Sequence, residues 1–103
     1  MVPYMVPLLF VSYYLGKVMA TIEQILEAMR VSPKSVKFTD CLKVCIYYFG
    51  KARISGSHFV FKTPWKGEPW VNIQMHGNEM KPYQVKQVLS AIDKLKDGSD
   101  DKS

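Results

Sequence analysis

The chain has 103 residues, of which 48% are hydrophobic and 13% aromatic, and its formal net charge at pH 7 is +5. This length suits a single small domain and excludes multi-domain catalysts and most dinucleotide-dependent enzymes. The apolar content is too high for general disorder, and two cysteines are too few for a disulfide-built scaffold. The positive charge is concentrated between residues 19 and 96, which carry twelve basic and six acidic side chains, so we expect an anionic partner.

The first 18 residues form an apolar segment that contains Pro3 and Pro7. The segment is shorter than the roughly 20 apolar residues of a membrane helix, and it lacks the basic start of a secretory signal. A regular helical pattern follows Met19, so we interpret Met19 as the natural start. Residues 1–18 are then an upstream extension outside the core, 19–96 is the folded domain, and the protein is expected to be cytoplasmic.

Two helices are predicted in the first half of the domain. A capping-box pattern that begins at Thr21 predicts the start of the first, and Pro33 predicts its end. The second helix can open at Thr39 or Asp40, and Gly50 is a natural stop. The predicted buried stripes are Ile22, Ile25, Leu26 and Met29 in the first helix and Leu42, Cys45, Ile46 and Phe49 in the second.

After Gly50 the period of the apolar residues changes from 3.6 to 2, which predicts three strands in the segments 51–55, 57–62 and 70–75. A last helix has Pro82 in its first turn, and the polar tail 97–103 is expected to be disordered. The order of elements predicts an α+β fold, a three-stranded antiparallel sheet with helices packed on one face. The predicted buried stripe of the last helix is Val85, Val88, Leu89, Ile92 and Leu95.

The two faces of the predicted sheet differ in character. Its apolar face, which must meet the helices, carries Phe59, Phe61, Val71, Ile73 and Met75. Its opposite face carries Lys51, Arg53, His58, Lys62, Asn72 and Gln74. His58 is therefore a group that titrates near pH 7 within a predicted basic patch.

The motif Gly56-Ser57-His58-Phe59-Val60-Phe61 resembles the HicA family of toxins. The segment Val71-Asn72-Ile73-Gln74-Met75-His76-Gly77-Asn78, followed by Lys81-Pro82 and an amphipathic helix, is also similar to that family. The similarity covers about Phe38 to Leu95, so the helix that begins near Thr21 is additional to the shortest members. Many members carry a second histidine directly after the first, where this chain has Phe59.

The resemblance implies a fold like that of double-stranded RNA-binding domains, and it implies a ribosome-independent mRNA endonuclease. The catalytic residue would be the histidine of the Gly-Ser-His motif, His58. The partners would be the mRNA substrate and a cognate HicB-type antitoxin that holds the toxin inactive. DNA binding for operon control would reside in the antitoxin, so we expect no direct DNA binding by this chain alone and no membrane association.

The chemistry of these residues independently suits RNA cleavage. RNA supplies its own nucleophile, the 2′-hydroxyl, and an imidazole with an ordinary pKa of about 6.5 can accept its proton. Lys51, Arg53 and Lys62 would disfavour the protonated imidazole and would stabilise charge on the phosphoryl oxygens. We therefore expect in-line attack that leaves a 2′,3′-cyclic phosphate and a 5′-hydroxyl, with no metal and no cofactor.

Other polar residues are weaker candidates. Ser57 is kept as an accessory residue only, because adjacent strand residues point to opposite faces and Ser57 cannot readily act as a nucleophile paired with His58. His76 is also kept as an accessory residue only, because a histidine in a loop is more often merely solvated. Lys66 is a candidate RNA contact in the turn between the last two strands, and Lys81 with Lys86 is another near a helix start.

Two further pairs have open or structural interpretations. Cys41 and Cys45 are four residues apart on a helix, and they fit a buried core pair better than a metal site. Trp65 and Trp70 flank the turn, where stacking on RNA bases and packing at the hairpin end both remain open. The rival to the enzyme is a non-catalytic RNA-binding module of the same fold; a third alternative is a degenerate member that serves only as a partner-binding subunit.

Overall fold

The computed structural model describes residues 8–67 and 70–98, with side chains from Thr21 onward. Its sheet has the strand order β1-β2-β3 with both pairs antiparallel, which confirms the predicted α+β fold. The elements in chain order are α1 (Leu8–Val31), α2 (Phe38–Phe49), β1 (Arg53–Ser55), β2 (His58–Phe61), β3 (Val71–Gln74) and α3 (Pro82–Asp97).

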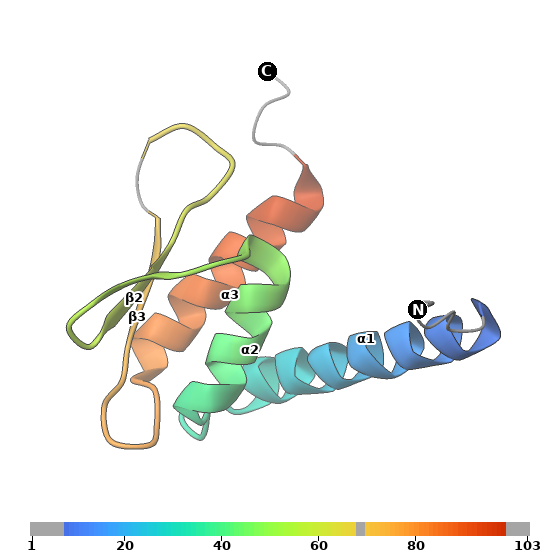
Figure 1. Cartoon of the computed structure of the whole chain (residues 1–103). Coiled ribbons are helices and arrows are strands. Elements are labelled where there is room, and N and C mark those ends of the chain that lie inside the picture. Colours follow the sequence, from blue (N-terminus) through green and yellow to red (C-terminus); the bar gives the residue numbers. More distant parts are fainter. Residues whose placement is uncertain (1–7, 68–69, 99–103) are drawn as a thin grey trace, which may run out of the picture.

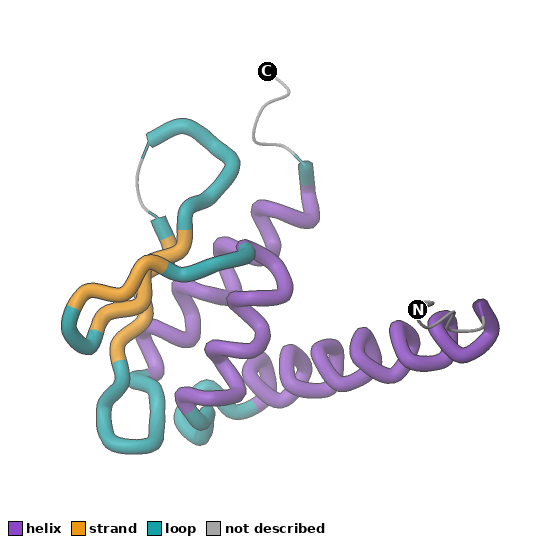
Figure 2. The backbone as a smooth tube through the Cα atoms, viewed as in Figure 1, coloured by secondary structure: helices purple, strands orange, loops and turns teal. Residues whose placement is uncertain are grey.

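The helices lie together on one side of the sheet (Figures 1 and 2). α2 and α3 lie next to the strands, and α1 packs against both helices while its amino-terminal half extends away from the rest of the molecule. The core between these layers is apolar, and Phe61, Ile73, Val85 and Ile92 are among the residues with no exposed surface. In the described part of the chain, no helix is long and apolar enough to cross a membrane.

Two glycines allow tight turns, one between β1 and β2 and one after β3. Gly56 has φ +62 and is the first of the two residues that join the paired Ser55 and His58, where a hairpin turn of this kind requires a positive φ. Gly77 has φ +65 and occupies the same place between His76 and Glu79. The second turn is tied to the start of α2, because the Phe38 N–H donates to the Asn78 carbonyl over 2.9 Å.

The start of the first helix was predicted wrongly. α1 begins at Leu8, so Thr21 lies inside the helix and the capping-box pattern marks no terminus. The sequence from Leu8 to Ala20 has no proline and a single glycine, and extending an existing helix is far easier than starting one. Residues 1–7 of the predicted extension lie outside the described residues, and the described buried core begins at Ile22.

Three further expectations need correction. Ile46 is 49% exposed because the buried stripe of α2 runs through Cys41, Val44 and Cys45, rotated from the predicted one. Met75 was expected to point inward, but β3 ends at Gln74 and Met75 is 48% exposed, since the regular alternation stops with the strand. Asp97 belongs to α3 rather than to the polar tail, and residues 99–103 lie outside the described residues.

Among the described residues, two ion pairs connect α1 to α3, Arg30 with Asp93 at 2.6 Å and Lys96 with Glu23 at 3.9 Å, and the first is the tighter. The Arg30 guanidinium donates from both terminal nitrogens to the two carboxylate oxygens of Asp93, at 2.6 and 3.3 Å. This hydrogen bonding holds the pKa of Asp93 below its ordinary value, and both side chains are partly exposed. Exposed pairs of this kind contribute about 0.2–1 kcal/mol to stability.

We expect this contribution to disappear in acid. A carboxylate whose pKa is lowered by folding stabilises the protein above its unfolded pKa of about 3.9, and the contribution falls as the pH drops through the folded value. Urea unfolding of Arg30→Met, Asp93→Asn and the double variant measures the coupling of the pair. The coupling free energy between Arg30 and Asp93 should be about 0.2–1 kcal/mol at pH 7 and should vanish near pH 2. A coupling free energy that does not change with pH would contradict this account.

Candidate functional site

The sheet face that points away from the helices carries the polar strand residues. Phe59, Phe61, Val71 and Ile73 face the helices and are buried or half-buried. The alternation and the register therefore place the neighbouring residues on the opposite face in two rows across the three strands. One row is Ser55, His58 and Gln74, and the other is Arg53, Val60 and Asn72.

His58 is the first residue of β2, and its side chain is exposed on this face. Its Nδ1 lies 3.1 Å from Oδ1 of Asn72, the diagonal neighbour on β3. An amide oxygen only accepts hydrogen bonds, so this contact requires Nδ1 of His58 to carry the hydrogen. The neutral ring then has its lone pair on Nε2, which is the atom available to accept a proton from a ligand.

The other end of the same row is held by a second set of hydrogen bonds. The Gln74 amide nitrogen donates to the Ser57 hydroxyl over 3.2 Å. The Gln74 backbone N–H donates to Oε1 of Gln84, a buried residue in the first turn of α3, over 3.1 Å. α3 is thereby attached to β3 directly behind the His58 row. Ser57 lies in the hairpin turn and serves there as a partner of Gln74.

The structure brings only some of the predicted cations to this face. Arg53 is a diagonal neighbour of His58 across the β1–β2 pair, at a Cα separation of roughly 7–8 Å for such positions. Lys51 precedes β1 and lines an apolar groove toward α2 with Ile54 and Phe59. Lys62 follows the other end of β2, where its Nζ lies 6.0 Å from the ring centre of Trp70.

The remaining predicted residues lie around the edges of the sheet. Lys66 is exposed in the loop between β2 and β3. His76 is exposed in the turn after β3, where its backbone forms an isolated antiparallel β-bridge with Glu79. Cys41 and Cys45 are fully buried free thiols in α2, and their mutual hydrogen bond together with burial raises the pKa of Cys45 far above its ordinary value. The pair therefore belongs to the core.

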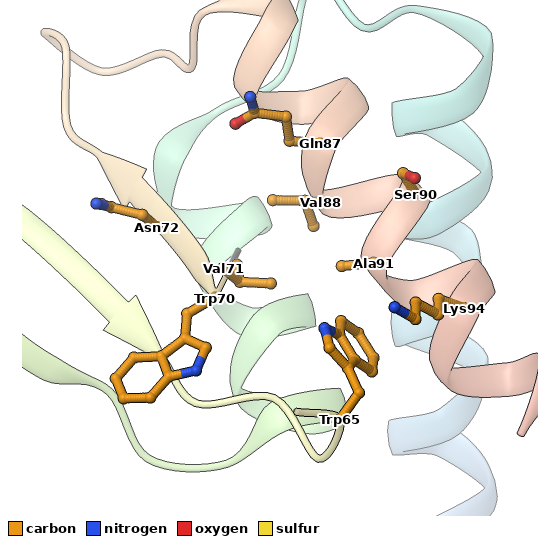
Figure 3. Close-up of a pocket in the computed structure, with 9 residues that line it drawn as sticks. All are labelled: Trp65, Trp70, Val71, Asn72, Gln87, Val88, Ser90, Ala91 and Lys94. Atoms are coloured by element: carbon orange, nitrogen blue, oxygen red, sulfur yellow. The ribbon is translucent and has the colours of Figure 1, made fainter. Parts of the chain in front are cut away.

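A pocket of about 340 Å³ lies between the β2–β3 loop, β3 and α3 (Figure 3). Figure 3 shows the indole rings of Trp65 and Trp70 on the strand and loop side, with Val88, Ala91 and Lys94 of α3 opposite. Trp65 is only 8% exposed, and Nζ of Lys94 lies 4.4 Å from its ring centre.

Three of these features could not be predicted from the sequence. Asn72 was placed on the correct face, but its contact with His58 depends on a diagonal pairing that only the register shows. Gln84 is not part of the predicted buried stripe of the last helix, yet it is buried and accepts a hydrogen bond from the Gln74 backbone. The contact between Lys94 and Trp65 could not be predicted either, because the two residues are 29 positions apart in the sequence. Two tryptophans at a turn were the sequence signal that pointed to a binding site here.

The position after His58 faces the helices. Phe59 pairs with Ile73 and packs edge-on against Phe38, with ring centres 5.2 Å apart. A second imidazole at this position would point away from the His58 row. Position 59 therefore contributes no side chain to the face that carries His58.

Comparisons of the chain with protein-family models, with curated proteins and with solved structures gave no match.

Proposed function

We propose that this protein is an mRNA-cleaving toxin of a toxin–antitoxin pair, with His58 as the general base. The single observation that carries the proposal is the exposed His58 side chain, whose Nδ1 contacts Asn72 on the sheet face opposite to the described helices. The resemblance of the Gly-Ser-His segment and of residues 71–82 to the HicA family supports the same function.

In the proposed reaction, Nε2 of His58 takes the proton of a ribose 2′-hydroxyl as its oxygen attacks the adjacent phosphorus. The bond from phosphorus to the 5′-oxygen of the next nucleotide breaks, and this oxygen takes a proton from water while the proton on Nε2 returns to solvent. The products therefore carry a 2′,3′-cyclic phosphate and a 5′-hydroxyl. Arg53, the nearest cation on the same face by register, would stabilise the negative charge that develops on the phosphoryl oxygens.

The protein would act in the cytoplasm and be neutralised by a HicB-type antitoxin. Such a partner would cover the His58 face and present acidic residues toward Arg53 and the flanking Lys51 and Lys62. Co-expression of the neighbouring open reading frame should then relieve the growth arrest that the toxin causes.

The structure of the cleavage products tests this proposal. Purified protein is incubated with a single-stranded RNA in the presence of EDTA, since the proposed route needs only a base and positive charge. We expect products that carry a cyclic phosphate by mass spectrometry and that polynucleotide kinase can label at the 5′ end without prior dephosphorylation. The same RNA with 2′-O-methyl groups should stay intact. Products with a 5′-phosphate would refute the mechanism, and binding without cleavage would favour the non-catalytic RNA-binding module.

Asn72 is expected to act as a positioning residue for His58. Asn72→Ala removes the acceptor that holds the hydrogen on Nδ1, and loss of one hydrogen bond predicts roughly 2- to 10-fold slower cleavage. Asn72→Asp keeps an acceptor but adds a charge that favours imidazolium, which should move the pH profile of cleavage toward higher pH. Nitrogen chemical shifts of the His58 ring report the tautomer directly; an unchanged tautomer in Asn72→Ala would contradict the role.

A further inference from the structure

The pocket beside the two tryptophans is a cavity that the proposed mechanism does not use. Its volume of about 340 Å³ lies within the usual range of small-ligand sites, roughly 300–1,000 Å³. Buried Val71 and Val88 form part of its wall. The indole of Trp65 is buried, whereas that of Trp70 is half-buried and remains accessible.

The chemistry of the wall points to a flat, aromatic and negatively charged ligand. Indole rings stack on nucleobases whatever the base, because every base has a π face. The ammonium of Lys94 lies against Trp65 and that of Lys62 lies near Trp70, so each ring has a cation beside it. The described residues that line the pocket include no carboxylate.

The pocket and the His58 face share a residue of β3. Val71 and Asn72 line the pocket, and Asn72 is also the residue that contacts His58. Trp70 precedes Gln74 of the His58 row by four positions, which is roughly 13 Å along a strand. A strand of RNA crossing the His58 face can therefore reach the pocket within a few nucleotides.

We propose that this pocket, named here the tryptophan pocket (Trp65, Trp70, Val88, Ala91 and Lys94), binds an unpaired base of the RNA substrate outside the cleavage position. The proposal rests on the proposed function, because it assigns the ligand as a single-stranded RNA. Lys62 and Lys94 would contact the phosphates that flank the stacked base. A base held here would fix the position of the chain over His58 and thereby favour single-stranded over duplex RNA, whose bases are already stacked and paired.

Intrinsic fluorescence gives a direct readout, because Trp65 and Trp70 are the only two tryptophans of the chain. The wild-type chain is titrated with a 2′-O-methyl RNA oligonucleotide, which the proposed reaction cannot cleave. Tryptophan emission reports occupancy of the pocket, and the anisotropy of a dye on the RNA reports overall affinity. We expect the emission to be quenched along the same binding curve as the anisotropy.

Variants separate base stacking from charge. Trp70→Leu should weaken RNA binding by about 5- to 100-fold, the usual effect of losing one stacked base, and Trp70→Phe should restore most of it. Tyr83→Leu is the matched control, since Tyr83 is an aromatic residue of α3 that is 55% exposed outside the pocket. Lys94→Gln should weaken binding more than Lys43→Gln, which removes the same charge from an exposed position on α2.

An oligonucleotide with abasic sites keeps the phosphates but lacks the bases. The abasic oligonucleotide should bind the wild-type chain more weakly than the intact one, and Trp70→Leu should cause no further loss of affinity for it.

The proposal is overturned if Trp70→Leu binds the intact oligonucleotide as tightly as wild type. It is also overturned if Trp70→Leu loses only its binding to the antitoxin, which would make the pocket a protein-docking site. Cleavage by wild type in either case leaves the proposed function standing. Absence of both cleavage and binding in wild type overturns both proposals.

Discussion

Replacing His58 with alanine is expected to slow RNA cleavage by about 10²–10⁴-fold while RNA binding persists. A positioned general base contributes this much to proton transfer, and nothing else among the described residues of the His58 face has an imidazole. Because His58 is exposed at the first position of β2, its truncation leaves no cavity in the core. The folded state should therefore be retained, as circular dichroism and urea unfolding can check.

The other histidine provides the control for this experiment. His76→Ala removes an exposed imidazole in the turn after β3 and should leave cleavage within a few-fold of wild type. Cleavage rates on one RNA and affinities for its 2′-O-methyl form are measured for both variants. Unchanged cleavage in His58→Ala eliminates His58 as the base. Loss of binding together with cleavage would instead assign His58 a role in holding RNA.

Truncation of Phe61 should have the largest effect on stability. Phe61 is on the helix-facing side of β2 with no exposed surface, and a buried Phe→Ala substitution costs about 3–5 kcal/mol. Val60, its half-buried neighbour, faces the other way and pairs with Arg53 and Asn72. Val60→Ala is therefore expected to cost much less. Since small domains have roughly 5–15 kcal/mol in total, Phe61→Ala is expected to leave a marginally stable protein.

This pair of variants also tests the orientation of His58. Side chains alternate between the faces of a sheet, so a shift of register by one residue would turn Phe61 outward and His58 toward the helices. Urea unfolding at neutral pH gives the two free energies. A loss at Val60 that equals or exceeds the loss at Phe61 would show that the faces are reversed, and the proposed catalytic role of an exposed His58 would fail with it.

Separation of the two faces explains how so small a chain can combine a core with a binding surface. The apolar residues of β2 and β3 meet α2 and α3, while the alternate residues stay free for a ligand. The hydrogen bond from the Gln74 backbone to Gln84 connects the two sides, because it joins the row that carries His58 to the helix that lines the tryptophan pocket. The tryptophan pocket and the Asn72 contact of His58 therefore both depend on the position of β3, which α3 holds.

Four features could be predicted from the sequence: the α+β class, the three short strands, the last helix from Pro82 and the outward position of His58. These follow from local periodicity and turn chemistry, which act over neighbouring residues. Other features depend on the packing of distant segments. The contact between His58 and Asn72 depends on strand register, the exposure of Ile46 depends on how α2 is rotated against the core, and the meeting of Lys94 with Trp65 depends on the packing of α3 against a loop. Contacts between residues distant in the chain are set by packing of whole elements, and no local pattern of residues encodes them.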